Sequence, residues 1–363
     1  MQINILLPHK EKFTKEKAAS VSITVKNNFQ YSDFKTKIKI FGQFVEKPML
    51  EKNFCGIKNP DSFFISKNKN LAVQMCKIIG KQKSSNQLIE VHNRPYLVNI
   101  INKKLDQKII TLFLHNDPLE MRGSKTIKDR ENLLSLSSKI YCVSKYIKQR
   151  FLKGITHDRE KVVVLYNGII PFCNKMPKKE KTVIFVGRVV KEKGIHLYVE
   201  AIKNISKRFN DWKFKIIGSS TLGENKYKDS FSKDMVEKFN KIGKNTYVLG
   251  YLPPNDLKEI MKKSSIIVIP STWQEPFGLV AAEAMSFGVA IISSKVGGLS
   301  EVISNGGILI ENIDSNKIEK SLISLLSCKK LLDKFQEASW KNFRFHASVS
   351  SKSLDTHRKK LIT

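Results

Sequence analysis

Short apolar runs alternate with polar or amphipathic stretches along the first half of the chain. Amphipathic stretches such as Ser144–Leu152 suit helices, whereas the apolar runs have the length and residue types of buried strands. Parallel strands need a crossover connection, usually a helix, so this alternation predicts a doubly wound α/β domain. The strands predicted in this half are Ile3–Leu7, Lys37–Phe41, Gln87–Val91, Lys108–Leu114, Lys139–Val143 and Lys161–Leu165.

The alternation pauses at Pro171–Glu180, where proline, lysine and weak periodicity favour a linker, and then resumes. Strands are predicted at Thr182–Val186, Lys213–Ile217, Thr246–Leu249, Ile266–Ile269, Ala290–Ser293 and Ile308–Ile310. Helices are predicted at Gly194–Phe209, in the charged stretch before Gly243, and at Pro254–Lys263, Phe277–Phe287 and Asn316–Ala338. We therefore expect two doubly wound, Rossmann-like α/β domains, 1–170 and 181–340, that face a cleft and bind ligands at the carboxyl ends of their strands.

Length and composition narrow the class of protein. The 363 residues suffice for two domains, and no apolar run approaches the ~20 residues of a membrane-spanning helix. The segment Met1–Lys10 favours a first strand over a signal peptide. Five scattered cysteines without a CxxC pair favour a reducing compartment and argue against a disulfide framework or a zinc knuckle. These features predict a soluble, cytoplasmic protein.

The formal charge of +31 raises the question of an anionic partner. Only nine of the 64 basic residues are arginine, and an excess of Lys, Asn and Ile is typical of AT-rich coding. The lysines Lys10, Lys12, Lys15 and Lys17 could contact an anionic membrane or could simply be solvated. No aromatic residues interleave with Lys and Arg in an RNA-binding pattern, so we do not expect nucleic acid as a partner.

The segment Glu275–Met285 is the sharpest motif, because it follows a predicted strand directly. Pro276 suits the first turn of a helix, and Gly278 would let a ligand approach free backbone amides at the helix start. If both were helical, Glu275 and Glu283 would stand about 12 Å apart. That spacing is too wide for a glycosidase carboxylate pair, but it suits two groups that grip opposite ends of an extended ligand.

The second motif, Gly187–Gly194, lies between a predicted strand and a helix. It places Arg188 and Lys193 on one short loop, where two cations can stabilise a diphosphate leaving group. In a lysine-rich chain, these two basic residues alone would not indicate a binding site. Together the two motifs resemble those of the family 4 retaining glycosyltransferases, whose two-domain architecture is called GT-B, and the resemblance is strongest over Thr182–Ile310.

The resemblance implies that Arg188 and Lys193 bind the diphosphate of a nucleotide-sugar donor and that Glu283 holds its ribose hydroxyls. Glu275 would contact the transferred sugar, aided by the amides of Phe277, Gly278 and Leu279. Gly297, Gly298 and Glu301 match the family's usual "GG-x-x-E" sequence after the next strand. The nucleobase would pack near Gly218 and near Tyr251 and Leu252.

In the first half, two polar stretches follow predicted strands, each with a proline that holds the loop extended. Histidine and asparagine can orient hydroxyl groups, and arginines could meet an acidic acceptor. The stretch "HNDPxxMRG" resembles a family 4 branch of bacterial lipopolysaccharide-core and polysaccharide assembly, in which the equivalent of His115 lies near the transferred sugar. The candidates on the acceptor side are His92, Asn93, Arg94, Asn116, Asp117 and Arg122.

The resemblance also implies that the C-terminal segment, 341–363, returns to the first domain. One departure is the loop after Pro8, where many members carry a Gly-Gly pair and this chain has Lys10–Lys17 followed by Ala18, Ala19 and Ser20. Whether these small residues replace the glycines is open.

The expected reaction is transfer of a sugar, with retention, from a UDP- or GDP-sugar to a hydroxyl of a glycan or glycolipid. No Asp-x-Asp pair is present, so we expect no metal and no other cofactor. Glu275 is either an electrostatic stabiliser or a nucleophile. The alternatives are a sugar-nucleotide epimerase and a non-catalytic nucleotide- or glycan-binding protein of the same fold. A phosphorylase would need a pyridoxal lysine, for which there is no clear candidate.

Overall fold

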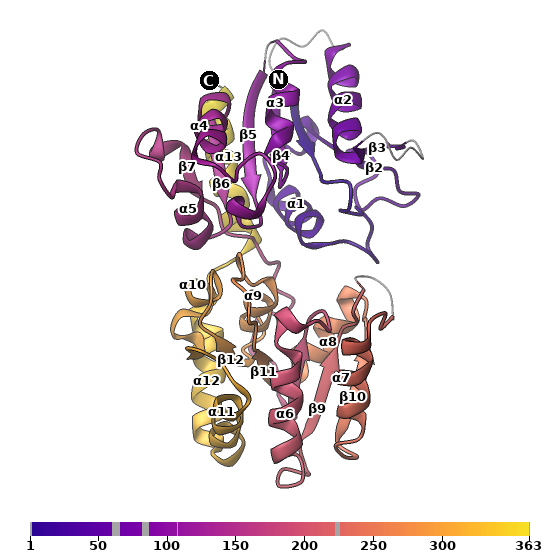
Figure 1. Ribbon diagram of the computed structural model, residues 1–363, viewed down its shortest axis with the longest axis vertical. Coiled ribbons are helices and arrows are strands. Elements are labelled where there is room, and N and C mark those ends of the chain that lie inside the picture. The colour runs from indigo at the N-terminus through magenta and orange to yellow at the C-terminus, as the bar shows by residue number, and fades with distance from the viewer. Residues whose placement is uncertain (1, 60–65, 82–86, 107, 222–225, 363) are drawn as a thin grey trace. The chain divides into compact units, whose positions relative to one another are not determined.

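The computed structural model describes residues 2–59, 66–81, 87–106, 108–221 and 226–362 (Figure 1). The chain divides into two compact units, Met1–Ile170 with Phe345–Thr363, and Pro171–Arg344. Each unit is built on one parallel sheet with its own core. Among the described residues, no helix is long and apolar enough to cross a membrane.

The first unit contains a seven-stranded sheet of order β3-β2-β1-β4-β5-β6-β7, and its described strands pair in parallel. All six residues of β4 are buried, as expected for a strand covered on both faces. The strands are β1 (Gln2–Leu6), β2 (Ile38–Gln43), β3 (Phe54–Ile57), β4 (Gln87–His92), β5 (Lys108–Leu114), β6 (Lys139–Cys142) and β7 (Val162–Val164). The helices are α1 (Ser20–Tyr31), α2 (Lys67–Gly80), α3 (Tyr96–Asn102), α4 (Ile127–Leu136), α5 (Lys145–Leu152) and α13 (Ala347–Ile362).

The second unit contains a six-stranded parallel sheet of order β10-β9-β8-β11-β12-β13. The strand order reverses between β8 and β11, the point at which ligands of doubly wound sheets bind. The strands are β8 (Glu180–Val186), β9 (Lys213–Ile217), β10 (Thr246–Gly250), β11 (Ser264–Ile269), β12 (Ala290–Ser294) and β13 (Gly307–Ile310). The helices are α6 (Ile195–Ile205), α7 (Ser230–Asn240), α8 (Pro254–Lys263), α9 (Leu279–Met285), α10 (Leu299–Ile303), α11 (Ser315–Ser327) and α12 (Lys329–Asn342).

The prediction of two doubly wound α/β domains is confirmed. Several local predictions are wrong. The single helix expected over 316–338 is two helices, α11 and α12, because Cys328 has an extended backbone that breaks the hydrogen-bond ladder. Strand β3 was not predicted, since it is an edge strand with a glycine and only one buried residue. Glu180, expected in the linker, is the first residue of β8.

Helix α13 joins the first unit through buried charges. Arg358 donates from Nε and Nη2 to the two carboxylate oxygens of Glu90 on β4, at 2.8 and 2.7 Å, and from Nη1 to Asp355 at 3.0 Å. Asp355 also accepts bonds from the Ser32 hydroxyl and the Asp33 amide, at 2.9 and 2.6 Å, at the end of α1. Burial alone would lower the pKa of Arg358, but the two carboxylates more than offset it, so the pKa is raised.

Replacing Arg358 by alanine would leave Glu90 and Asp355 buried without their counter-charge. We expect this change to lower the free energy of unfolding of the first unit by about 3–5 kcal/mol. All three tryptophans, Trp212, Trp273 and Trp340, lie in the second unit. In a denaturant titration, the circular-dichroism transition should therefore move to lower concentration, while the tryptophan-fluorescence transition moves much less.

The neighbouring Lys359→Ala is the matched control, because the ion pair of Lys359 with Asp33 is exposed. Such a pair contributes at most about 1 kcal/mol. If Arg358→Ala unfolds with the wild-type midpoint, the buried charges do not hold α13 to the sheet.

Candidate active site

Two loops of the second unit meet at the point where the strand order reverses. The loop after β8 leads through a short 3-10 helix, Lys191–Lys193, to Gly194, whose φ is +69°. A Cβ atom at Gly194 would stand 1.8 Å from the carbonyl oxygen of Pro270 in the loop after β11, so only glycine allows this approach. The amide of Thr272 also donates to the carbonyl of Glu192, at 2.9 Å. The two loops are therefore held together by backbone contacts.

Glu275 is buried at this junction, and its carboxylate is surrounded by donors. Its Oε1 accepts bonds from the Ser271 hydroxyl at 2.7 Å, from the Trp273 indole at 2.9 Å and from the Lys193 ammonium. The Lys193 ammonium also lies 5.1 Å from the centroid of the Trp273 ring. A buried carboxylate requires such compensation, since desolvation disfavours its charged form. We call Lys193, Ser271, Trp273 and Glu275 the Glu275 cluster.

The backbone of Glu275 packs closely against Gly297 and Gly298. A Cβ atom at Gly297 would lie 2.3 Å from the Glu275 carbonyl oxygen, and one at Gly298 would lie 2.5 Å from that of Pro276. The Gly298 amide donates to the Glu275 carbonyl at 2.6 Å, and the Gly297 amide donates to the Gln274 side chain at 2.7 Å. The two glycines thus fix the position of the Glu275 segment. Glu301, the last residue of the predicted "GG-x-x-E" pattern, lies in α10.

The helix after Glu275 starts later than predicted. Helix α9 begins at Leu279, with Gly278 at its N-cap in a left-handed conformation, φ +104°. Pro276 and Phe277 therefore precede the helix, and Glu275 is not helical, so the 12 Å spacing estimated for Glu275 and Glu283 does not apply. A Cβ atom at Gly278 would lie 2.5 Å from the Leu299 side chain, so this left-handed position requires glycine.

Glu283 is half-buried on α9. Burial raises the pKa of its carboxyl, and the positive charge of Lys258 partly opposes that shift. Lys258 was not among the predicted site residues, because the sequence placed it on α8 without indicating that α8 lies near Glu283.

The remaining donor-side candidates gather at the ends of β8, β9 and β10. A Cβ atom at Gly218, φ +135°, would lie 1.9 Å from the carbonyl oxygen of Gly187, and the Gly218 amide donates to the Gly250 carbonyl at 2.7 Å. Arg188 follows Gly187 and is exposed, with no ion pair to any described residue. Tyr251 and Leu252 follow Gly250 and are half-buried. The fold therefore brings these sequence-distant candidates to one edge of the sheet.

In the first unit, His92 and His115 form a buried pair at the ends of β4 and β5. Their rings stack, and His92 Nδ1 lies 3.0 Å from His115 Nε2. Burial holds the pKa of His92 well below its usual range and lowers the pKa of His115 to about 4. Asn93, with φ +54°, ties the two strand ends together because its side-chain oxygen accepts the His115 amide at 3.2 Å. At neutral pH both rings are therefore uncharged.

The other acceptor-side candidates have separate surroundings. Asp117 caps the turn at Leu119 and pairs with Arg150 at 2.7 Å, which gives it a clear role in local folding. The Arg122 guanidinium lies 5.0 Å from the Tyr96 ring centroid. Arg94 donates to the carbonyl of Asn93 at 2.6 Å, and Asn116 is exposed.

Sequence reasoning missed Ser271 and Trp273, the two neutral donors to Glu275. Both lie just past the end of β11, where side chains of a doubly wound sheet commonly meet a ligand. That position was the available signal, but nothing in the sequence shows that their donors converge on Glu275.

Known proteins resemble this chain in sequence and in fold. Residues 169–342, nearly all of them in the second unit, match the family model described as "Glycosyl transferases group 1". An uncharacterized glycosyltransferase of Methanocaldococcus jannaschii, MJ1178, is 30% identical over 197 residues, which are 54% of this chain and 51% of that protein. The chain thus spans about half the length of this relative. The lipopolysaccharide 1,2-N-acetylglucosaminetransferase of Salmonella typhimurium is 23% identical, over 73% of this chain and 80% of that enzyme.

Solved structures are similar along almost the whole chain. A glycosyltransferase from Rickettsia africae has a TM-score of 0.76 at 18% identity, covering 100% of this chain and 98% of that one. Anabaena HepE, solved in complex with UDP and glucose, has a TM-score of 0.75 at 17% identity, covering 99% of both chains. At these identities the similarity establishes the fold, which is the predicted GT-B class.

Gly297→Ala tests the support of the Glu275 segment. The added methyl would meet the Glu275 carbonyl, and φ +50° at Gly297 is unfavourable for alanine. We expect the second unit to lose about 1–3 kcal/mol of unfolding free energy. Because the Trp273 indole bonds to Glu275, its fluorescence emission should change as well.

Gly243→Ala is the matched control in the same unit. The nearest atom to its added methyl is a side-chain oxygen, that of Asn245, at 3.2 Å. This variant should stay within about 0.5 kcal/mol of the wild type. Equal effects of the two substitutions would show that the backbone of Glu275 does not need the bare glycine.

Proposed function

We propose that the protein is a retaining glycosyltransferase of family 4 that transfers a sugar from a nucleoside diphosphate sugar to a hydroxyl of a glycan or glycolipid. The observation that carries this proposal is the Glu275 cluster, a buried carboxylate beside a lysine where the strand order reverses. The group 1 family match over the same unit and the nucleotide in the Anabaena HepE structure support it. The donor that we infer is a UDP- or GDP-sugar.

The roles of the donor-side residues follow from their chemistry. Lys193 can keep its bond to Glu275 and still donate to a phosphate oxygen, because an ammonium group has three donors. Arg188 is exposed on the same loop after β8, and its guanidinium can pair with two phosphate oxygens at once. The Phe277, Gly278 and Leu279 amides would face the sugar. Glu283 would accept the ribose hydroxyls, and Gly218, Tyr251 and Leu252 would flank the base.

In the reaction that we infer, the acceptor hydroxyl attacks the anomeric carbon on the face from which the diphosphate leaves. The bond between that carbon and the phosphate oxygen breaks, and the hydroxyl proton passes to the leaving phosphate. Positive charge develops on the sugar as this happens, and the Glu275 carboxylate would stabilise it. Two cations on the leaving group would stabilise the opposite charge, so we expect the route to need no metal. The metal independence stays a prediction.

His115 would orient a hydroxyl group rather than act as an acid, since burial keeps its imidazole uncharged at neutral pH. A neutral imidazole offers one donor and one acceptor, and the bond with His92 fixes which nitrogen faces the substrate. The other candidates in this unit, Asn93, Arg94, Asn116 and Arg122, would complete the acceptor side.

The acceptor class that we propose is a lipopolysaccharide or other cell-surface glycan, made at the cytoplasmic face of the membrane. The Salmonella relative's activity on lipopolysaccharide and the excess positive charge of the chain support this assignment. A peripheral contact between basic side chains and anionic lipid would bring the enzyme to a glycolipid acceptor.

Nucleotide binding tests the donor site directly. We expect one of UDP, GDP or ADP, or its sugar conjugate, to raise the melting temperature of the wild type by several degrees, since a ligand at about 100 times its Kd adds about 2.7 kcal/mol. Lys193→Ala and Glu283→Ala should lose most of this shift. Chelator should leave both the shift and the transfer activity unchanged.

Lys203→Ala is the matched control, because Lys203 is exposed on α6 and pairs with the exposed Glu200. It should keep the full nucleotide shift. If no nucleotide stabilises the wild type up to millimolar concentration, the donor assignment is wrong. If a nucleotide binds but neither transfer nor hydrolysis of any sugar conjugate is detected, the non-catalytic alternative is the better one.

A further inference from the structure

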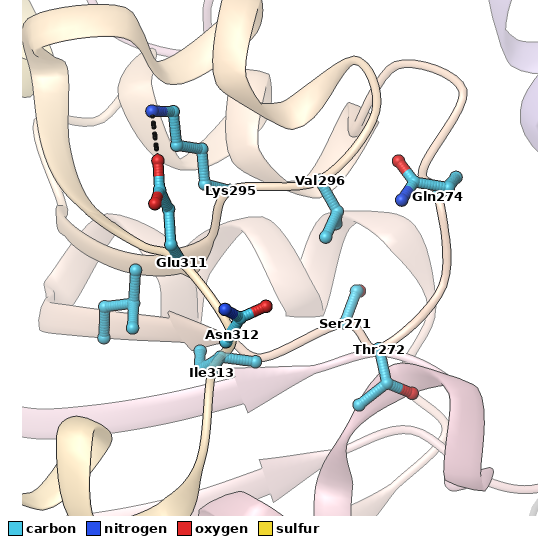
Figure 2. Close-up of a pocket in the computed structure, with 9 residues that line it drawn as sticks. Ser271, Thr272, Gln274, Lys295, Val296, Glu311, Asn312 and Ile313 are labelled. Carbon is cyan, nitrogen blue, oxygen red and sulfur yellow. Dashed lines mark hydrogen bonds and ion pairs between the residues drawn. The ribbon is translucent and has the colours of Figure 1, made fainter.

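A pocket of about 480 Å³ lies in the second unit over the carboxyl ends of β11, β12 and β13 (Figure 2). Its volume falls within the range of small-molecule sites, about 300–1,000 Å³. The residues with a proposed donor role follow β8, β9, β10 and β11, whereas the pocket extends from β11 over β12 and β13. None of the residues to which we assign a donor role lines this pocket.

The charged side chains that line the pocket have no net charge. Lys295 and Glu311 pair at 2.7 Å, so their charges compensate each other (Figure 2). The lining itself therefore has no unpaired positive charge that would hold an anion such as a phosphate. The chemistry of the pocket therefore suits a neutral ligand.

Two primary amides are available to that ligand. The side chain of Asn312 bonds to none of the described residues, and Figure 2 shows it beside Ser271 within the pocket. Gln274 accepts the Gly297 amide through its oxygen, which leaves its NH₂ group without a partner among the same residues. A primary amide offers both donors and an acceptor, the combination that neighbouring hydroxyl groups require.

The lining also has apolar side chains, Val296, Ile310 and Ile313. A pyranose ring presents C–H groups on its faces and hydroxyls at its edge. Apolar side chains with amides beside them match both parts of such a ring.

The backbone at Asn312 supports a binding role. Its φ is +47°, a left-handed conformation that asparagine tolerates better than most residues but that still carries a cost. Costs of this kind are common at ligand sites. This conformation aims the Asn312 side chain in the direction that Figure 2 shows, toward Ser271.

We propose that this pocket is a binding subsite for a neutral pyranose unit, separate from the donor region. It is linked to the Glu275 cluster, since Ser271 lines the pocket and donates to Glu275 at 2.7 Å. A sugar bound there contacts the same loop that positions Glu275. The subsite does not require that the protein transfers sugar, so it stands or falls independently of the proposed function.

Saturation-transfer NMR on the full chain tests the proposal. The probes are methyl α-glucopyranoside, methyl α-galactopyranoside and N-acetylglucosamine as free sugars, and maltotriose as a sugar within a chain. We expect at least one probe to bind and to remain bound when UDP or GDP is added. A stronger signal for maltotriose would identify a glycan as the source of the unit, and a stronger signal for the single sugars would identify a free saccharide.

Two variants locate the site. Asn312→Gly removes the amide and keeps the left-handed backbone, and Val296→Phe fills the pocket without removing a polar partner. Each should weaken sugar binding about tenfold or more, the loss of one good hydrogen-bonded contact or of the space itself. Both should keep the wild-type melting temperature and nucleotide shift. Asn210→Gly, on an exposed turn before β9, is the matched control and should bind as the wild type does.

The proposal is overturned if no probe binds, if the two pocket variants bind sugar as well as Asn210→Gly does, or if nucleotide displaces the sugar. It is also overturned if inorganic phosphate, and not a sugar, shows variant-sensitive binding. If Val296→Phe does not fold, Asn312→Gly alone decides. If nucleotides do not raise the melting temperature of the wild type, that result counts against the proposed function and not against this pocket.

Discussion

The site of the second unit depends on one constraint, the close contact between the Glu275 segment and two glycines, Gly297 and Gly298. There is no room for a single methyl group between Gly297 and the Glu275 backbone. Gly194 imposes the same closeness between the loops after β8 and β11. Because backbone meets backbone at both places, Lys193, Ser271 and Trp273 reach one carboxylate oxygen. The Glu275 cluster thus depends on the glycines, which have no side chain, as much as on the side chains that bond to Glu275.

The first unit is held together in a different way. Its last helix, α13, comes from the far end of the chain and is fixed by the buried charges of Arg358, Glu90 and Asp355. Glu90 lies on β4, two residues before His92, so the ion pair stabilises the strand that carries the histidine pair. Ring contacts continue from His92 through Phe113 to Tyr141 and then to His357 on α13. The C-terminal helix and the histidine pair are therefore parts of one packed layer.

Strands were predicted well because buried parallel strands are continuous apolar runs, as β4 and β11 show. Edge strand β3 lacks such a run, and the break at Cys328 changes one residue's backbone without changing the apolar period. In the site, the two sequence motifs identified Glu275 and Lys193 as candidates. Their direct bond, the donors on Ser271 and Trp273, and the late start of α9 depend on contacts between distant segments, which no local pattern encodes. The pairing of Asp117 with Arg150 was hidden for the same reason.

Hydrogen exchange, measured by mass spectrometry with and without a nucleotide sugar that stabilises the protein, tests the central claim most directly. The claim is that the donor lies against the loops that meet at Glu275. It predicts slower exchange in the segments 187–194, 217–219 and 275–283, and none of this protection in Lys193→Ala. Protection confined to other segments, or protection at Glu275 that survives Lys193→Ala unchanged, would contradict it.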